Sequence, residues 1–295
     1  MKRLRKVAVI GVGLIGGSFA LALRRSGFAG PTAGFDRDRS ALERATGLHA
    51  IDEIAESVSE AVRGADLVVV AVPVRAIGGV LHDVGLALEP NAVVTDVGST
   101  KVEVVDTARQ ELRERFPRFV PGHPIAGREA SGIEAATPDL FKGARVVLTP
   151  TGETQAKATD VVRAAWEAVG ARVSMLAAAD HDRIFAAVSH LPHLLSFTLV
   201  SDIASRPESA ELFGFAAGGF RDFTRIAASS PEMWRDIALQ NREALLAELD
   251  RFGARLAVFR ELIEKGDGPA LERLMAEARG ARTAWAGPPR RGNSE

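Results

Sequence analysis

The residue of this sequence best suited to acid–base chemistry is a histidine in a short glycine-bounded motif. His123 stands in Gly122-His123-Pro124-Ile125-Ala126-Gly127. Pro124 biases the histidine toward extended geometry, and the flanking glycines indicate a tight loop. Neutral imidazole has an ordinary pKa of about 6.5, which suits it to accept a hydroxyl proton at cellular pH. A histidine that only stabilises the turn is the alternative.

A glycine-rich turn near the N-terminus predicts a dinucleotide site. Gly11, Gly13 and Gly16 follow the apolar run Val7 to Ile10 and lead into a helical segment, and Asp36 comes twenty positions after Gly16. This order of strand, turn, helix and acid is typical of dinucleotide-binding domains. We expect the cofactor to be bound by Gly11, Gly13, Leu14, Ile15, Gly16 and Asp36, with Val72 and Pro73 from a later loop.

The choice between the two nicotinamide cofactors depends on Asp36. A carboxylate accepts hydrogen bonds from the ribose hydroxyls and repels a 2'-phosphate, so it predicts NAD over NADP. Arg37 and Arg39 follow directly and leave the strictness of that choice open. A proton acceptor beside a hydride acceptor is what the oxidation of an alcohol requires.

Ser99 is a second candidate for contact with the reacting group. It lies in the turn Gly98-Ser99-Thr100-Lys101, just after the predicted strand that ends at Asp96. Its hydroxyl either caps the following helix or hydrogen-bonds the substrate or the catalytic base, and the two roles are compatible.

Two histidines lie together in a helical segment expected from about Asp180 to Ile203. His190 and His193 share a helix face, but no further ligand follows at a suitable distance, so we expect no metal site. Pro192 between them predicts a kink, which would shape a pocket or a helix crossing.

A glycine-hinged segment, residues 218–226, carries Arg221 and Arg225 around Asp222. Arginine can grip a carboxylate through two parallel hydrogen bonds, so this segment is a candidate clamp for an acidic substrate. The alternative is a solvated loop with an ion pair to Asp222.

The elements that must position these residues change type along the chain. Apolar runs at residues 67–72, 93–96, 119–121 and 146–148 predict further strands, with helices at 40–46, 55–62 and 102–115. After about residue 175 only helical patterns follow. The sequence therefore predicts an α/β Rossmann-type dinucleotide-binding domain over residues 1–176, an all-α domain over residues 177–284 and a disordered tail over residues 285–295.

One predicted helix carries a continuous apolar stripe from Leu245 to Ile263. Leu249, Phe252, Leu256 and Phe259 lie between them at alternating steps of three and four. The stripe belongs either to the core of the helical domain or to a subunit interface.

Composition narrows the class of protein. Lys and Arg total 37 against 38 for Asp and Glu, so the net charge of −1 gives no reason to expect a nucleic acid or an anionic membrane as partner. The chain has no cysteine, which excludes thiolate chemistry and fits a cytoplasmic location. Glycines interrupt the apolar stretch near the N-terminus, which disfavours a secretory signal.

Five motifs together resemble the prephenate and arogenate dehydrogenase family of tyrosine biosynthesis, over nearly the whole chain. They are VIGVGLIGGSFA near the start, DVGSTK from Asp96, GHPIAGREASG from Gly122, VSHLPHLLSF from Val188 and FRDFTRIAASSPEMWRDI from Phe220.

The resemblance implies an oxidative decarboxylation of prephenate to 4-hydroxyphenylpyruvate with NAD, and a homodimer formed through the helical domain. His123 would accept the proton of the substrate 4-hydroxyl, and Ser99 would hydrogen-bond that hydroxyl. Arg225 would bind a substrate carboxylate and His193 would line the substrate site. Glu129 would be a gating or substrate-side residue, and Trp234 would line the pocket or pack in the core.

Several alternatives stay open. The substrate could be L-arogenate, or both compounds, and feedback inhibition by tyrosine is invisible in a sequence. A β-hydroxyacid dehydrogenase would have the same architecture but normally uses a lysine in its helical domain, and residues 180–205 contain none. A non-catalytic NAD-sensing protein is a rival of another class.

Overall fold

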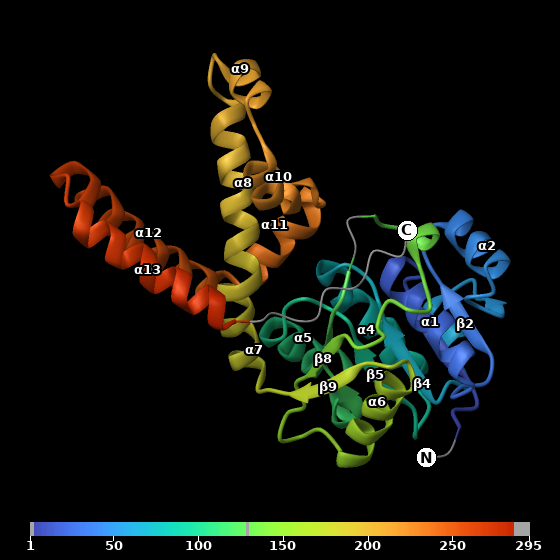
Figure 1. The fold of residues 1–295 in the computed structure, drawn as a ribbon. Coiled ribbons are helices and arrows are strands. Elements are labelled where there is room, and N and C mark those ends of the chain that lie inside the picture. Colours follow the sequence, from blue (N-terminus) through green and yellow to red (C-terminus); the bar gives the residue numbers. More distant parts are fainter. Residues whose placement is uncertain (1–2, 128–129, 286–295) are drawn as a thin grey trace. The chain divides into compact units, whose positions relative to one another are not determined.

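The strands of the first half form a parallel sheet in which β1, β4, β5 and β6 are buried on both faces. A computed structural model describes residues 3–127 and 130–285 (Figure 1). The six-stranded sheet has the order β3-β2-β1-β4-β5-β6, which is the strand order of dinucleotide-binding folds. Its strands are β1 (Val7–Ile10), β2 (Thr32–Phe35), β3 (Glu53–Ile54), β4 (Leu67–Val70), β5 (Val93–Asp96) and β6 (Phe119–Val120).

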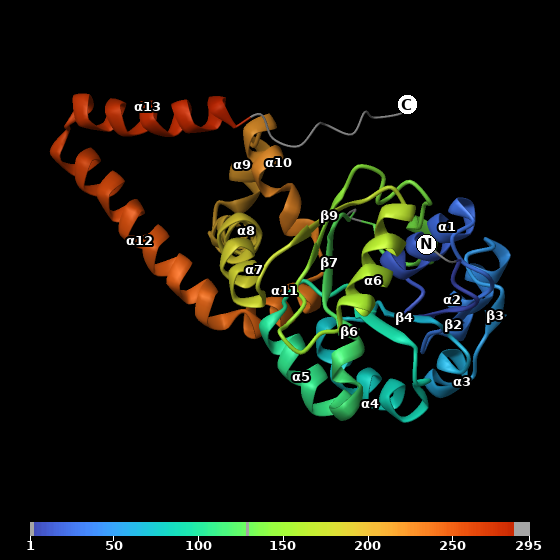
Figure 2. The same ribbon diagram turned by 90° about the horizontal axis from the view of Figure 1, so that it is seen from below.

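Helices cover both faces of this sheet, so its valine-rich strands are enclosed in two layers of core. One face packs against α1 (Leu14–Ser26), α2 (Arg39–Gly47) and α6 (Ala156–Ala168). The other packs against α3 (Val58–Val62), α4 (Ile77–Ala87) and α5 (Val102–Leu112). Figure 2 shows α3, α4 and α5 along one side of the sheet and α1 and α6 along the other. Strands buried on both faces read as continuous apolar runs, which is why this domain could be predicted.

A second, three-stranded sheet carries the segment around His123. Strand β7 (Gly122–Ile125) pairs antiparallel with β8 (Arg145–Leu148), and β8 pairs parallel with β9 (Arg172–Met175). The prediction of a tight loop around His123 was therefore wrong. Pro124 is compatible with the ladder because the extended geometry it imposes on His123 is also that of a strand.

A long helical stretch with a π-turn follows the strands. Helix α7 (Ala178–Phe185) passes through a π-turn (Ala186–His190) into α8 (Leu191–Ala204). Pro192 lies in the first turn of α8 and lacks the N–H that a regular helix would use. The predicted irregularity at Pro192 is thus accommodated by the wider π-turn.

The remaining elements are helical. They are α9 (Ser209–Gly214), α10 (Gly218–Thr224), the 3₁₀ turn Arg225–Ala228, α11 (Pro231–Gln240), α12 (Arg242–Lys265) and α13 (Gly268–Ala284). Residues 218–226, for which a solvated loop was the alternative interpretation, are therefore mostly helix. The first compact unit extends to Leu245, and a second begins at Leu246 and consists of the rest of α12 with α13. In the second unit Leu256 and Ile263 of the apolar stripe are 58% and 64% exposed.

Candidate active site

A cavity of about 540 Å³ lies beyond the carboxyl ends of β1, β2 and β4, where ligands bind in sheets of this kind. Five of the residues predicted to bind a cofactor line it: Gly11, Gly13, Asp36, Val72 and Pro73. The structure thus gathers segments that are far apart in the sequence around one space.

The glycine turn leaves room for a diphosphate at the start of α1. Gly11 has φ +95°, and a Cβ there would lie 2.4 Å from the carbonyl oxygen of Ala71. A Cβ on Gly13 would meet no atom within 4 Å. Gly13 is also the N-cap of α1 and offers no side-chain partner to the amides of the first turn, formed by Leu14, Ile15 and Gly16. Free amides at a helix N-terminus are a ready site for an anionic phosphate.

Asp36 lies at the end of β2 beside this turn. Its carboxylate accepts hydrogen bonds from the backbone N–H groups of Val12 (2.9 Å) and Asp38 (3.0 Å). These bonds fix the carboxylate at the cavity wall, while its other lone pairs stay available to ribose hydroxyls. The Asp36 carboxylate and the free amides at the start of α1 therefore fit NAD.

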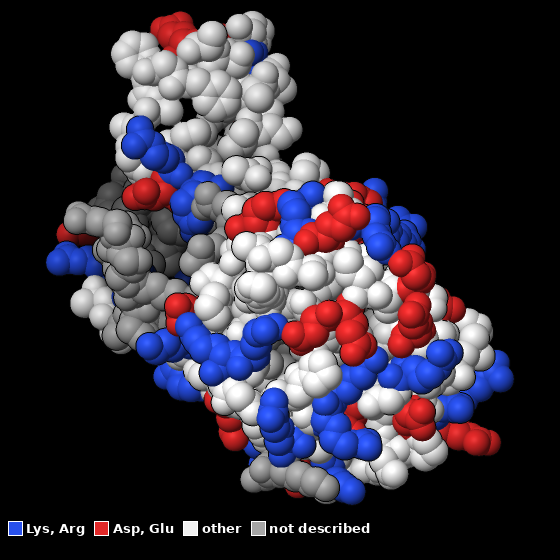
Figure 3. All heavy atoms as spheres, turned by 90° about the vertical axis from the view of Figure 1, so that its right-hand side faces the viewer, with Lys and Arg blue, Asp and Glu red and all other residues white. Residues whose placement is uncertain are grey.

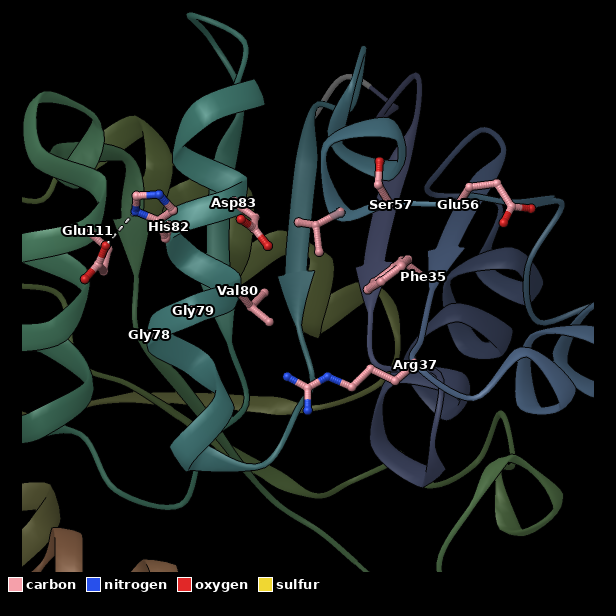
Figure 4. Close-up of a pocket in the computed structure, with 11 residues that line it drawn as sticks. Phe35, Arg37, Glu56, Ser57, Gly78, Gly79, Val80, His82, Asp83 and Glu111 are labelled. Carbon is pink, nitrogen blue, oxygen red and sulfur yellow. Dashed lines mark hydrogen bonds and ion pairs between the residues drawn. The ribbon is translucent and has the colours of Figure 1, made fainter.

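A second cavity of about 620 Å³ adjoins the first and shares Phe35, Arg37 and Val80 with it. Figure 4 shows Phe35 and Arg37 on one side of this groove and His82 on α4 at the other. His82 hydrogen-bonds Glu111 at 3.0 Å, and both residues lie outside the cofactor cavity.

Helix α11 completes the cofactor cavity, which sequence reasoning missed. Glu232, Arg235 and Asp236 line it together with Arg75. The Arg235 side chain donates to the buried carboxylate of Asp236 at 2.7–2.8 Å, and Arg75 approaches the same oxygen at 3.8 Å. The wall of the cavity is thus built by both the sheet-containing and the helical parts of the first unit.

His123 is half-buried in β7 and faces α7. Its Nδ1 lies 2.8 Å from Nε2 of His181, and its ring packs against the rings of His181 and Phe185 with centroids 5.0 Å apart. Among the described residues no group hydrogen-bonds Nε2 of His123, and this atom is not one of the fully buried unpartnered ones. The lone pair of Nε2 is therefore not used by any residue that the structure describes.

The surroundings keep the His123 ring neutral. Burial lowers its pKa well below the ordinary 6.5, and positive charge on His181, Lys101 or His190 lowers it further. Burial likewise lowers the pKa of His181, against the opposing effect of Asp182. A neutral imidazole with an unused lone pair can act as a general base.

A buried ion pair holds the segments that carry His123 and Ser99. Lys101 and Asp96 are both fully buried and paired. The Lys101 ammonium also donates to the carbonyl of Gly122 at 2.8 Å. The Asp96 carboxylate accepts from the N–H groups of Gly98 (2.8 Å) and Gly122 (3.1 Å). Both the N–H and the carbonyl of Gly122 are thus hydrogen-bonded to this ion pair, directly before His123.

Ser99 lies in the turn between Gly98 and α5, but it is not a helix cap. The N-cap of α5 is Lys101, and the carboxylate of Asp182 accepts hydrogen bonds from the N–H groups of Lys101 and Val102, each at 2.8 Å. The capping interpretation of Ser99 was therefore wrong, because a residue eighty positions later supplies the cap. The half-buried hydroxyl of Ser99 is left for the other predicted role.

Three predicted substrate residues form a separate cluster in the helical part of the first unit. The His193 ring stacks on Trp234 with centroids 3.6 Å apart and an interplanar angle of 21°. The helix α8, which carries His193, packs against the 3₁₀ turn that begins at Arg225. Burial lowers the pKa of His193, and the Arg225 guanidinium lowers it further. Nδ1 of His193 donates to the carbonyl of Ser189 at 2.8 Å, which leaves Nε2 as an acceptor.

His190 joins this cluster to the base. Its ring lies 6.0 Å from that of Trp234, and its charge, when present, acts on the pKa of His123. Nδ1 of His190 accepts from Asn241, so its buried Nε2 is a donor that has no partner, as is Nε1 of Trp234. Two unpartnered N–H donors in this cluster favour an anionic or carbonyl-bearing ligand.

Glu129 lies outside the described residues, as do residues 286–295 of the predicted tail. In residues 3–127 and 130–285, no three His, Cys, Asp or Glu side chains gather in a way that could hold a metal ion.

Comparison with known proteins decides the family. The nucleotide-binding domain of prephenate dehydrogenase matches residues 19–175, and the dimerization domain of prephenate dehydrogenase matches residues 177–277. The chain belongs to the prephenate dehydrogenase family. It is therefore an NAD-dependent oxidoreductase by family, in agreement with the cavity described above.

Relatives resemble the chain over almost its entire length. Cyclohexadienyl dehydrogenase of Zymomonas mobilis is 37% identical over 95% of this chain and 96% of its own. The crystal structure of prephenate dehydrogenase from A. aeolicus with hydroxyphenyl propionate and NAD+ has a TM-score of 0.89 and 39% identity, covering 95% of this chain and 98% of its own. Arogenate dehydrogenase of Synechocystis has a TM-score of 0.81 and 33% identity, covering 95% and 100%.

Several residues of the prephenate dehydrogenase site were not predicted from the sequence. His181, Asp182, Lys101 and Asp96 surround the base, and none of them was singled out as a site residue. Lys101 and Asp96 do lie within the DVGSTK motif, so a charged pair at the end of a buried strand was a usable signal. The role of Asp182 left no local signal, because it acts on a helix that begins far earlier in the chain.

Proposed function

We propose that this protein oxidatively decarboxylates prephenate to 4-hydroxyphenylpyruvate with NAD, a step of tyrosine biosynthesis. The observation that carries the proposal is Nε2 of His123, which no described residue hydrogen-bonds, in a ring kept neutral by burial, in the same compact unit as a cavity suited to NAD. Family membership gives the substrate class, and the geometry gives the base.

The reaction needs a proton acceptor at the substrate alcohol. Nε2 of His123 takes the proton of the 4-hydroxyl as C4 loses hydride, and the ring carboxylate leaves as carbon dioxide while the ring becomes aromatic. The proton then returns from His123 to the phenolate oxygen of the product. NAD, when bound, accepts the hydride. Ser99 hydrogen-bonds the same hydroxyl and so aligns it with the base.

The other end of the substrate carries an anionic side chain. Arg225 binds its carboxylate, with His193 and Trp234 forming the adjacent wall. We assign cofactor binding to Gly11, Gly13, Leu14, Ile15, Gly16, Asp36, Val72 and Pro73. The nucleotide-binding part takes residues 1–176, and residues 177–284 bind substrate and dimerise.

L-arogenate is a second candidate substrate. Its support is the likeness to the cyclohexadienyl dehydrogenase of Zymomonas mobilis and to the arogenate dehydrogenase of Synechocystis. Prephenate and arogenate differ at a keto or amino group on the side chain, so steady-state assays with both substrates and both cofactors decide between them.

The quaternary structure proposed is a homodimer formed by the helical part. Of the first unit, Val188, Phe215 and Phe223 are 66%, 84% and 51% exposed. Figure 3 shows charges of both signs interspersed over the sheet-containing region, and few charges on the projecting end formed by α8 and α9. A dimer would bury this apolar surface.

A membrane is the alternative to a protein partner as the cover of this exposed apolar surface. By length and composition alone, Ala178–Ala204 could cross a membrane. It also carries His181, Asp182 and His190, which are buried in the site, and this favours a covering protein partner over lipid. We place the dimer in the cytoplasm.

Substitutions of His123 and Arg225 test the proposed roles separately. His123→Asn should lower kcat by roughly 10²–10⁴, the usual contribution of a general base, without changing the Kd for NAD. Arg225→Ala should act mainly by raising KM for prephenate, because it removes binding rather than chemistry. Equal and small effects of the two substitutions on kcat and KM would refute this mechanism.

A further inference from the structure

The side chains of Asp182, His181 and His123 form a hydrogen-bonded series, and His123 at its end is the proposed proton acceptor. The Asp182 carboxylate lies 2.7 Å from Nδ1 of His181, and Nε2 of His181 lies 2.8 Å from Nδ1 of His123. His181 is fully buried and Asp182 is 4% exposed. Water therefore does not compete for the bond between His181 and Asp182.

The direction of the hydrogen bonds in this series is fixed by Asp182, the residue at the end remote from His123. An ionised carboxylate only accepts, so Nδ1 of His181 carries a proton and donates to Asp182. Nε2 of the neutral His181 ring then has a lone pair and accepts. It follows that Nδ1 of His123 carries the proton of that ring, and that Nε2 of His123 has the free lone pair.

The Asp182 carboxylate is itself held in a fixed orientation. The Asp182 carboxylate also accepts from the N–H groups of Lys101 and Val102 at the start of α5, and its backbone carbonyl accepts from Asn241 at 2.8 Å. Rotation of the carboxylate would break the cap of α5, so its orientation toward His181 is maintained by a helix.

We propose that Asp182 and His181 are positioning residues that hold His123 in the tautomer whose Nε2 accepts the substrate proton. The proposal deepens the proposed function and rests on it for the identity of that proton. In the opposite tautomer Nε2 would carry a hydrogen and could not act as a base. Neither residue needs to touch the substrate.

The groups that face His123 define what its pH dependence reports. They are His181 and Asp182 from α7, His190 from the π-turn, and Lys101 with Asp96 from the segment before α5. Positive charge on His181 lowers the pKa of His123. Removing His181 therefore raises the pKa of His123, so the acid limb of kcat/KM moves to higher pH.

Two substitutions at His181 separate position from charge. His181→Leu removes the acceptor for Nδ1 of His123, whereas His181→Gln retains an acceptor oxygen. Both should move the acid limb to higher pH, because both remove the imidazole. Only His181→Leu should lower the plateau kcat, by roughly 10-fold or more, and Gln should restore it to within about threefold.

Substitution of Asp182 gives a third test. Asp182→Ala removes the acceptor for Nδ1 of His181, so that neither His181 nor His123 is held in one tautomer. We expect kcat on prephenate to fall by about 10²-fold or more with KM and the Kd for NAD nearly unchanged. His82→Leu is the matched control, since His82 also pairs with a carboxylate but is exposed and outside the cofactor cavity (Figure 4).

A substrate-free readout keeps this proposal distinct from the proposed function. In wild-type protein with ¹⁵N-labelled histidine, NMR should show His123 protonated at Nδ1 and unprotonated at Nε2 at pH 7.5. Asp182→Ala should let His123 populate the tautomer protonated at Nε2 as well. Wild-type protein that fails to oxidise prephenate would overturn the function but not this result. Nε2 protonation in wild-type protein, or plateau kcat within twofold of wild type in folded His181→Leu and Asp182→Ala, would overturn the proposal.

Discussion

Removal of the Lys101 ammonium should destabilise the fold more than almost any other single loss of charge in the described chain. Lys101→Met would leave the Asp96 carboxylate fully buried with only the N–H groups of Gly98 and Gly122 as partners. Breaking a buried pair from one side costs about 3–5 kcal/mol, because the remaining charge is uncompensated. Small globular proteins have total stabilities of roughly 5–15 kcal/mol, so the loss is a large fraction.

The double variant separates this charge penalty from the loss of packing. In Asp96→Asn with Lys101→Met the buried charge is absent, and the free energy of unfolding should be at least about 1 kcal/mol higher than in Lys101→Met alone. Lys6→Met is the matched control, because Lys6 pairs with Glu53 at 3.0 Å where the Glu53 side chain is 53% exposed. Its cost should be about 0–1 kcal/mol.

Urea unfolding followed by tryptophan fluorescence measures these differences, since Trp166 is fully buried in the sheet-containing region. The reasoning would be refuted if Lys101→Met unfolded within about 1 kcal/mol of wild type, or if the double variant were less stable than Lys101→Met. The first result would show that the carboxylate is not stranded, and the second that packing rather than charge dominates.

Further predictions concern the cofactor, the base and acid stability. Gly13→Ala should leave Tm unchanged, because its Cβ meets no protein atom, but should raise the Kd for NAD about tenfold or more by entering the diphosphate space, as titration calorimetry would show. Asp36→Asn should shift the ratio of kcat/KM from NAD toward NADP by at least about tenfold; an unchanged ratio would contradict its assigned role. Burial lowers the pKa of His190 from 6.5 to about 4, so the unfolded chain binds more protons between these values. Stability is then full above pH 6.5 and is lost as pH falls toward 4, by about 3 kcal/mol, and His190→Gln should flatten this part of the unfolding profile.

The nucleotide-binding half could be predicted from local patterns because its strands are short apolar runs between glycine turns. Val7–Ile10 and Val93–Asp96 have the predicted bounds, since a buried parallel strand and its turn are both encoded within a few residues. Asp36 followed from its distance to Gly16 for the same reason. These features depend on neighbours in the sequence, and sequence reasoning can follow them.

Features that depend on distant partners were not predictable in this way. Strand β7 contains a glycine and a proline, and only its pairing with β8 makes it a strand. The segment with Arg225 is helical although two glycines precede it, because α8 and α10 pack together. Asp182 caps a helix eighty residues earlier, and that relation has no local pattern.

The central claim is that Nε2 of His123 accepts the proton of the substrate hydroxyl. A crystal structure of this protein with NAD and a 4-hydroxyphenyl product analogue measures it most directly. We predict that the analogue's hydroxyl oxygen lies about 2.6–3.2 Å from Nε2 of His123, with C4 facing the nicotinamide. A hydroxyl bound away from His123, with that ring turned from the cofactor cavity, would contradict the account.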